Sequence, residues 1–279
     1  MRLIFESDGK KLEMGDDCDA SVIEISGLGT PERQYNTKRY VNIPGQVTVS
    51  SHVLARNIVI KGDICLNGGL PTEKYHTFFC QSGMLTITGK DKKNINYNPV
   101  SFKTGNRNGE FVSFELKLVC DFPYFSDGND IPYEIYKRVD MVTGKFSLPK
   151  VFTKRVTEVD IYNAGQADSE PVITIGCTNQ GIYSGGIVIY NALTKKELKL
   201  DTNLSLGETI TIDIKNRKIS SNKRANCYGI LNENCVLSDF VIARGINHIL
   251  LTNLNDGETV TASILFNNLY AEAEIVERN

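Results

Sequence analysis

The sequence predicts a mainly β protein with two domains: a first β domain that contains one short helix, and a second domain that is a jelly-roll or galectin-like sandwich. From about Val156 onward, short strand-like segments follow one another with turn residues between them. In Thr209–Ile214 and Thr259–Phe266 aliphatic residues alternate with polar ones, which is typical of strands with one buried and one solvated face. A chain of 279 residues is long for one sandwich and long enough for two domains.

The first domain is expected to span residues 1–126 and to consist mostly of strands. Its last strand is the clearest, because Phe114, Leu116 and Leu118 alternate with polar residues. The predicted strands are Leu3–Phe5, Val22–Ile25, Ile58–Lys61 with Ile64, Leu85–Thr88 and Phe111–Cys120.

The segment Pro71–Gln81 is the best helix candidate. Proline stands near its start, Glu73 lies in its first turn and Gly83 follows its end, which are the usual signals of helix termini. Three aromatic residues at helical spacing are expected to face the sheet: Tyr75, Phe78 and Phe79.

The segment Gly29–Leu54 is predicted to form a long hairpin that projects from the domain. It holds a polar stretch, Glu32–Arg39, and a Pro44–Gly45 pair that favours a tight turn. Such an arm has no means of burying both of its faces, so we expect it to be ordered on a neighbouring subunit. The candidate contact residues are Tyr35, Tyr40, Val41 and Ile43. A mobile surface loop is the alternative interpretation.

Between Phe122 and Arg155 the apolar pattern loosens, so residues 127–156 are expected to be a linker and residues 157–279 the second domain. This domain shows eight strand patterns, the number found in a jelly-roll or galectin-like sandwich. They are Thr157–Tyr162, Val172–Ile175, Ile187–Tyr190, Leu198–Leu200, Thr209–Ile214, Lys218–Ser220, Ile249–Thr252 and Thr259–Phe266.

Composition argues against several functional classes. The formal charge of −2 and the pI near 6.0 do not suggest a nucleic-acid partner. No secretory leader or membrane-spanning run is visible, so we expect a soluble protein made in the cytoplasm. Seven cysteines, an odd number without a C-x-x-C pair, favour inert thiols over disulfides or zinc.

No motif predicts a catalytic, cofactor or metal site. The acidic run of Asp16, Asp17 and Asp19 lacks the spacing of a calcium loop, and Gly27–Gly29 leads into a proline instead of a phosphate-binding helix. The three histidines are His52, His76 and His248, which are far apart in the sequence. A Cys–His nucleophile pair stays open, since such partners meet only in space.

Seven segments occur in an order that resembles one protein family. The most specific is Phe114–Phe125, a strand that ends in an Asp-Phe-Pro-Tyr sequence. The others are Ser26–Arg33 continuing to Ile43–Gln46, Arg56–Gly62, Val159–Gly165 with Glu170–Ile175, Ile187–Asn191, Leu206–Asp213 and a turn at Gly245–Asn247. Together they resemble the distal tail proteins (the Dit family) of long-tailed phages, prophages and phage-derived tail-like particles of Gram-positive bacteria. The short aromatic helix departs from the longer helix usual in that family.

The resemblance implies a structural protein without a cofactor. Members have a tail-tube-like first domain that forms a hexameric ring, with galectin-like second domains outside it. The implied partners are further copies of the chain, the tail tube protein, the tail-tip hub or tail-associated lysin, and the tape measure protein, but no membrane. The implied location is the virion tail tip, after assembly in the host cytoplasm. The second domain has no loop long enough for the carbohydrate-binding module that larger members carry.

Two other functions remain open from the residues. A carbohydrate-binding protein used for host attachment would need an aromatic platform with polar residues on one face of the sandwich, and the chain has tyrosine and phenylalanine but no tryptophan. A glycoside hydrolase would need two facing carboxylates in a cleft. The sequence shows neither arrangement.

Overall fold

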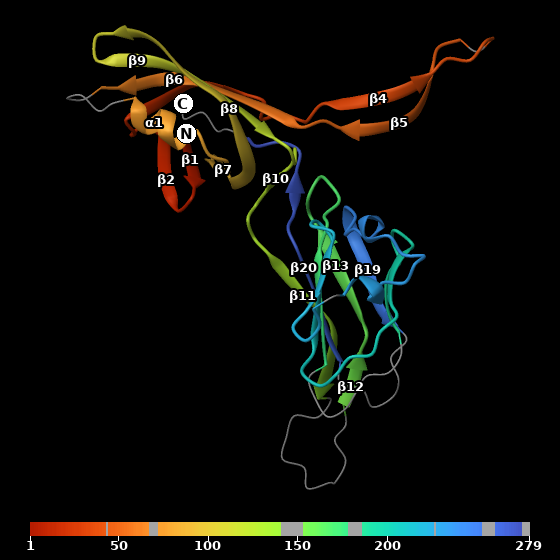
Figure 1. Ribbon diagram of the computed structural model, residues 1–279. Coiled ribbons are helices and arrows are strands. Elements are labelled where there is room, and N and C mark those ends of the chain that lie inside the picture. Colours follow the sequence, from red (N-terminus) through yellow and green to blue (C-terminus); the bar gives the residue numbers. More distant parts are fainter. Residues whose placement is uncertain are drawn as a thin grey trace. The chain divides into compact units, whose positions relative to one another are not determined.

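The computed structural model describes residues 1–42, 44–66, 72–140, 153–177, 186–225, 227–252 and 260–274. Within these ranges the protein is mainly β, as predicted, with one α-helix and the short 3-10 helices Tyr228–Ile230 and Leu237–Asp239. It divides into two compact units, Met1–Gly128 with Leu269–Asn279, and Asn129–Asn268 (Figure 1). No helix in the described ranges is long and apolar enough to cross a bilayer.

The first unit is built on one antiparallel sheet with the strand order β2-β1-β7-β8-β9-β6-β3. Strand β8 joins its two halves, because residues up to Tyr97 pair with β7 and residues from Asn98 pair with β9. The strands are β1 (Arg2–Ser7), β2 (Lys10–Gly15), β3 (Ala20–Ser26), β6 (Arg56–Cys65), β7 (Gly83–Thr88), β8 (Lys92–Asn108) and β9 (Phe111–Cys120), with the short strands β10 (Phe125–Ser126) and β21 (Leu269–Tyr270) off the main path.

The core of the first unit follows the alternation seen in the sequence. In β9, the residues Phe114, Leu116 and Leu118 are buried. Ile60 of β6, also buried, lies directly opposite Leu116. A one-residue shift in this register would turn these apolar side chains toward water, so burial fixes how the strands pair.

The predicted helix is present but shorter than expected. Helix α1 spans Glu73–Phe78, and Phe79 already leaves the helical conformation, while Pro71 lies outside the described residues. Tyr75, Phe78 and Phe79 are buried, as predicted. Phe79 packs edge-on against Phe5 of β1 with ring centroids 5.2 Å apart. The aromatic contacts, rather than helix length, hold this segment on the sheet.

The unit boundaries differ from the expected ones in two respects. The segment 127–156, expected to be a linker, contains β11 (Ile131–Asp140) and β12 (Thr153–Val156), and β11 pairs with β20 of the second unit. The end of the chain, expected in the second domain, belongs to the first unit, where β21 pairs with β10. The second unit is therefore inserted into the first between Gly128 and Leu269.

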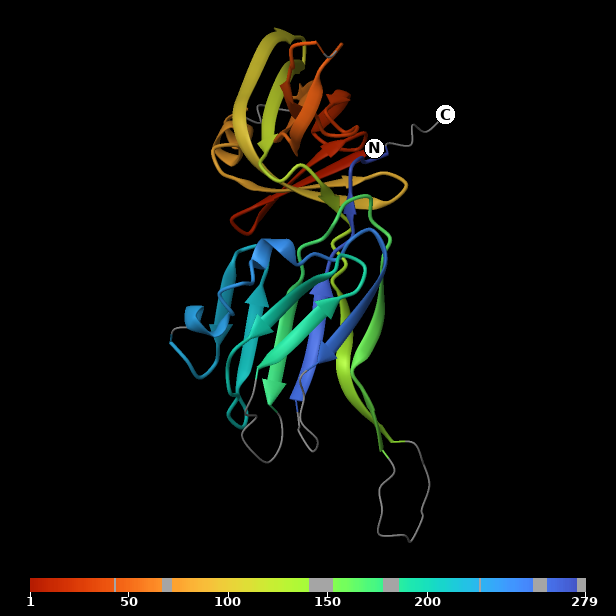
Figure 2. The same cartoon turned by 90° about the vertical axis from the view of Figure 1, so that its right-hand side faces the viewer.

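The second unit is a sandwich of two antiparallel sheets (Figure 2). One has the order β12-β11-β20-β14-β17-β18 and the other β13-β19-β15-β16. All eight predicted strands are present: β13 (Glu158–Asn163), β14 (Val172–Cys177), β15 (Ile187–Asn191), β16 (Lys196–Leu200), β17 (Thr209–Asp213), β18 (Lys218–Ser221), β19 (Gly245–Thr252) and β20 (Val260–Phe266). The expected turn at Gly245–Asn247 is instead the start of β19.

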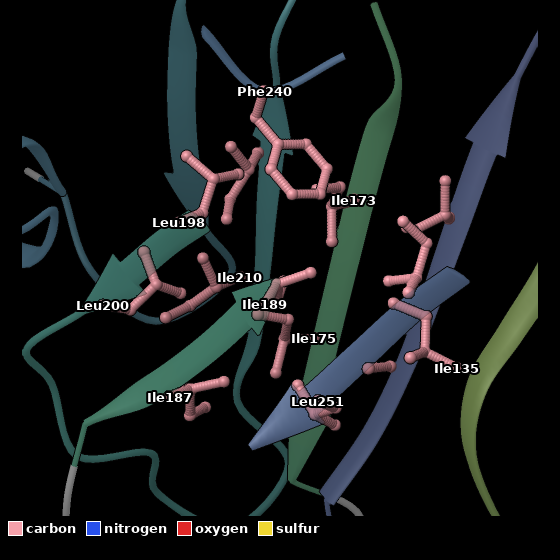
Figure 3. Close-up of a cluster of buried hydrophobic side chains, with 14 of the residues drawn as sticks. Ile135, Ile173, Ile175, Ile187, Ile189, Leu198, Leu200, Ile210, Phe240 and Leu251 are labelled. Carbon is pink, nitrogen blue, oxygen red and sulfur yellow. The ribbon is translucent and has the colours of Figure 1, made fainter. Parts of the chain in front are cut away.

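Aliphatic side chains from both sheets fill the space between them (Figure 3). Ile173 and Ile175 of β14 and Ile210 of β17 come from the six-stranded sheet, and all three are fully buried. Ile189 and Leu251 face them from the four-stranded sheet. Each such side chain contributes roughly 1.5–3 kcal/mol relative to exposure, so this core provides most of the driving force for folding the unit.

Three buried asparagines hold the turns at one end of the four-stranded sheet. Asn163 donates to the backbone carbonyl of Ile242, Asn191 donates to that of Val241, and Asn247 donates to that of Ala243. The side chains of Asn191 and Asn247 also bond each other at 2.9 Å. Asparagine suits these positions because its amide offers a donor and an acceptor, so buried backbone groups of both kinds are paired.

Glu208 is a buried carboxylate in the second unit. It accepts hydrogen bonds from the backbone N–H and hydroxyl of Ser205, both at 3.0 Å, from the hydroxyl of Ser221 at 3.0 Å, and from Arg224. Burial by itself would raise its pKa, but these donors and the guanidinium outweigh burial and lower the pKa to about 2.

We expect Glu208 to make the second unit sensitive to acid. Because its pKa is lower in the folded chain than the ordinary value of 4.5, its contribution is complete above pH 4.5 and is lost as the pH falls toward 2. The contribution is about 3 kcal/mol. In Glu208→Gln, stability at pH 7 should fall by a similar amount, and the loss between pH 4.5 and 2 should become shallower. Urea unfolding at a series of pH values measures both effects, and an unchanged pH slope in the variant would contradict this role.

Candidate functional site

The predicted arm is present as a two-stranded hairpin of the first unit. Strand β4 (Arg33–Lys38) pairs with β5 (Val47–Val53) from Arg33 opposite Val53 to Lys38 opposite Val47. These strands form a sheet of their own, separate from the nine-stranded sheet. Figure 1 shows the hairpin extending away from the rest of its unit.

The arm exposes apolar side chains along its length. Tyr35 in β4 is 57% exposed, and Tyr40 and Val41 at the tip are 51% and 90% exposed. Ile43, the fourth residue predicted to make contacts, lies outside the described residues. Two valines that the sequence reasoning did not select, Val47 and Val49, are also exposed. Their alternation with polar residues in β5 was the signal that would have identified them.

The backbone of the arm is paired on one side only. Asn36 and Thr37 of β4 lie opposite Ser50 and Thr48, so Val49 is an extra residue that bulges from β5. Strand β4 has no such interruption, and its outer edge carries no paired strand within the described part of the chain. An isolated two-stranded hairpin is marginally stable in water, and a free edge is a template for another strand. The arm therefore has the properties of a surface that a partner covers.

Arg56 fixes the base of the arm. It is 4% exposed, and its guanidinium donates to four backbone carbonyls: those of Pro123 at 2.7 Å, Gly27 at 2.6 Å, Gly29 at 2.5 Å and Ala271 at 2.6 Å. The same group lies over the ring of Phe125, 4.5 Å from its centroid. One side chain thus connects the segment before β4, the segment after β9 and the end of the chain.

Gly27 allows the chain to turn at this base. Its φ is +87°, and a Cβ atom built on it would lie 1.9 Å from the carbonyl oxygen of Asn57. Gly29, two residues later, has no atom within 4 Å of such a Cβ. The predicted turn at Gly27–Gly29 therefore requires glycine at position 27, where a side chain would clash with Asn57. Both residues also supply backbone carbonyls that accept hydrogen bonds from Arg56.

The residues that suggested chemistry in the sequence do not converge. In the acidic run, Asp16 pairs with the N-terminal amine and Asp19 with Lys74. His52 lies on the arm, His76 in α1 against Phe102, and His248 on β19 beside Asp160. No group of three His, Cys, Asp or Glu side chains in the described ranges is placed to hold a metal ion.

The seven cysteines, all within the described ranges, form no disulfide. Cys120 is fully buried at the end of β9, and burial raises its pKa to about 11. A thiol with such a pKa stays protonated near neutral pH and is a poor nucleophile.

Comparison with known proteins finds similarity in structure but not in sequence. No protein-family model matches the chain, and no curated protein matches it. The Dit protein of phage SPP1, described as a paradigm of the hub adsorption apparatus in phages that infect Gram-positive bacteria, superposes with a TM-score of 0.70 at 12% identity. The match covers 96% of this chain and 98% of the SPP1 protein.

The chain has the fold of a phage distal tail protein. This confirms, at the level of fold, the resemblance seen in the sequence. A chain of the phage P2 baseplate in its activated, calcium-bound conformation also superposes, with a TM-score of 0.51 at 10% identity and 99% coverage of both chains. The Dit-like fold extends over both units, because no large part of either chain is left out.

Proposed function

We propose that this chain is a structural subunit of a phage tail tip, in which six copies form a ring that joins the tail tube to the tail-tip hub. The observation that carries the proposal is the near-complete superposition on a protein of the SPP1 hub adsorption apparatus. The ring would contact the tail tube protein on one side and the hub or tail-associated lysin and the tape measure protein on the other. Such a subunit acts by holding its partners in fixed positions, which requires no catalytic residue.

We propose that the arm is the contact that closes the ring. A ring of identical subunits needs a heterologous interface, in which one patch meets a different patch on the neighbour. The arm supplies one such patch, with Tyr35, Tyr40, Val41 and the two exposed valines as apolar contacts. The free edge of β4 supplies backbone N–H and C=O groups for strand addition.

Deleting residues 32–50 tests this proposal. The full chain is expected to form hexamers in mass photometry and six-fold rings in negative stain. The deletion should yield monomers whose second unit still unfolds cooperatively in calorimetry, because the arm contributes nothing to that unit's core. The double variant Tyr35→Ser with Val41→Ser should weaken the ring about tenfold or more, since buried apolar contacts are lost.

Leu206→Ser is the matched control, because it removes an apolar side chain that is 51% exposed in the second unit. It should leave the ring intact. Hexamers in the deletion variant would show that the arm is not the contact that closes the ring. A full chain that stays monomeric at high concentration would contradict self-assembly of the ring itself.

A further inference from the structure

The outer face of the four-stranded sheet in the second unit exposes an apolar pair. Tyr162 of β13 lies directly opposite Ile246 of β19, and the two are 58% and 66% exposed. On the same two strands, Ile161 and Ile249 point inward and are fully buried. Because side chains alternate across a strand, the exposed pair belongs to the solvent face and not to a loosened core.

A second apolar pair lies further along this face, on the two central strands β19 and β15. Leu250 lies on the same face of β19 as Ile246, and it is directly opposite Tyr190 of β15. Leu250 and Tyr190 are both half-buried. The four side chains Tyr162, Ile246, Leu250 and Tyr190 are here called the Tyr162–Tyr190 strip. They form two apolar pairs, and His248 lies between the pairs on the same face of β19. Apolar side chains gathered in this way on the solvated face of a sheet indicate an interaction site.

Carboxylates lie on both sides of the strip. On β13, Glu158 and Asp160 have side chains that are 62% and 70% exposed. On β16, at the opposite edge of the sheet, Glu197 is directly opposite Tyr190 and is exposed. The cationic Lys199 on this face is within 3.4 Å of Asp201, and His248 lies 2.7 Å from Asp160 and 3.6 Å from Glu158. The face therefore carries two apolar pairs with His248 between them, and most of the charged side chains beside the pairs are carboxylates.

We propose that this face binds a segment of a partner protein that carries apolar side chains between lysine or arginine residues. The apolar side chains would cover the Tyr162–Tyr190 strip, and the cations would pair with Glu158, Asp160 and Glu197. Protein interfaces commonly combine apolar contacts with complementary charges beside them in this way. The inference rests on the second unit alone and depends on neither the arm nor the ring.

Other occupants fit the face less well. A second copy docked through the same face would bring acidic rims together, because a two-fold interface is self-complementary. A sugar would lose water from its hydroxyls against Ile246 and Leu250, which offer no hydrogen bonds in return. An anionic lipid surface would be repelled by the same carboxylates.

Fluorescence anisotropy with the full chain tests the proposal. The probe is a short labelled peptide in which leucine alternates with lysine, and its counterpart has glutamate for every lysine. The lysine peptide should bind at least about tenfold more tightly than the glutamate peptide, with an affinity that falls as salt is added. The double variant Tyr162→Ser with Ile246→Ser should weaken the lysine peptide about tenfold or more, as expected for central apolar contacts.

Two further variants localise the binding. Glu158→Gln with Glu197→Gln should reduce both the affinity and its salt dependence. Leu206→Ser should bind the peptide as the unchanged chain does, and calorimetry should show that every variant keeps the second unit folded. Equal binding by the double serine variant would overturn the assignment. Equal affinity for both peptides would also overturn it. The same holds if a neutral oligosaccharide binds, or if the chain self-associates, through Tyr162 and Ile246.

Discussion

Replacing Arg56 with methionine is expected to destabilise the first unit by about 3–5 kcal/mol. Methionine fills much of the volume but donates no hydrogen bond, so the four carbonyls that Arg56 contacts lose their common donor. Each buried carbonyl left unpaired costs roughly 1–3 kcal/mol, and the sum is offset in part because the charge no longer has to be desolvated. The melting temperature of the first unit should fall by on the order of 10 °C.

Calorimetry with hydrogen exchange by mass spectrometry measures this effect and locates it. Faster exchange should appear in the segments around Gly27, Pro123 and Ala271 and not in the second unit. Arg56→Lys should recover little of the lost stability. A lysine has a single ammonium group, which is too small to donate to carbonyls on three segments at once as the guanidinium does. Arg107→Met, which removes an exposed arginine from β8, is the control and should change stability by less than about 0.5 kcal/mol. A methionine variant as stable as this control would show that the carbonyls find other partners.

Gly27→Ala is expected to destabilise the first unit by about 3 kcal/mol or more, through a clash and through backbone strain. The new methyl group would lie 1.9 Å from the carbonyl oxygen of Asn57, far inside contact distance, and the positive φ disfavours any L side chain. The obstacle is backbone and not the flexible end of a side chain, so relief requires that β3 and β6 separate locally.

Gly29→Ala provides the matched control for this prediction. It makes the same chemical change two residues away, meets nothing within 4 Å and keeps the carbonyl that Arg56 contacts. Its stability should stay within about 0.5 kcal/mol of the unchanged chain. Thermal unfolding of the pair separates a steric requirement from a general preference for glycine in this turn. Similar melting temperatures for the two variants would be incompatible with the clash.

Many of the strands could be predicted from the sequence. A strand with one buried face has an apolar residue at every second position. Strand β9 was predicted with the bounds that the structure shows, Phe111–Cys120, since its apolar residues alternate without interruption. The strands of the second unit were also found, as in β17, where Ile210 and Ile212 face the core. The arm followed from a different signal: a polar segment with aromatic residues and a Pro-Gly turn.

The longest strand was missed for a physical reason. Strand β8 spans 17 residues, but its pattern is interrupted by irregularities near Pro99 and between Thr104 and Arg107, and its far half is exposed. A bulge changes which face the following residues occupy, so the alternation is lost in the sequence. Strand β11 was read as linker because it follows a polar loop, and its pairing with β20 is a distant contact.

The polar residues that organise the fold gave no local signal. Arg56 reads as an ordinary charged residue at the start of a strand, and its four acceptors come from positions as far away as Ala271. Asn191 and Asn247 belong to segments that carried the family resemblance, but only the folded chain shows that they bond each other. Periodicity reports burial of apolar faces, whereas these contacts depend on the tertiary structure.

The insertion of one unit within the other has a consequence for synthesis. The ribosome completes residues 1–128 first and the second unit next, so Ala271, whose carbonyl accepts a hydrogen bond from Arg56, is made only after the whole second unit. The second unit is a contiguous segment and is free to fold while translation continues. We therefore expect the base of the arm to become fixed only after the second unit has been synthesised, so that chains interrupted within that unit enter assembly poorly.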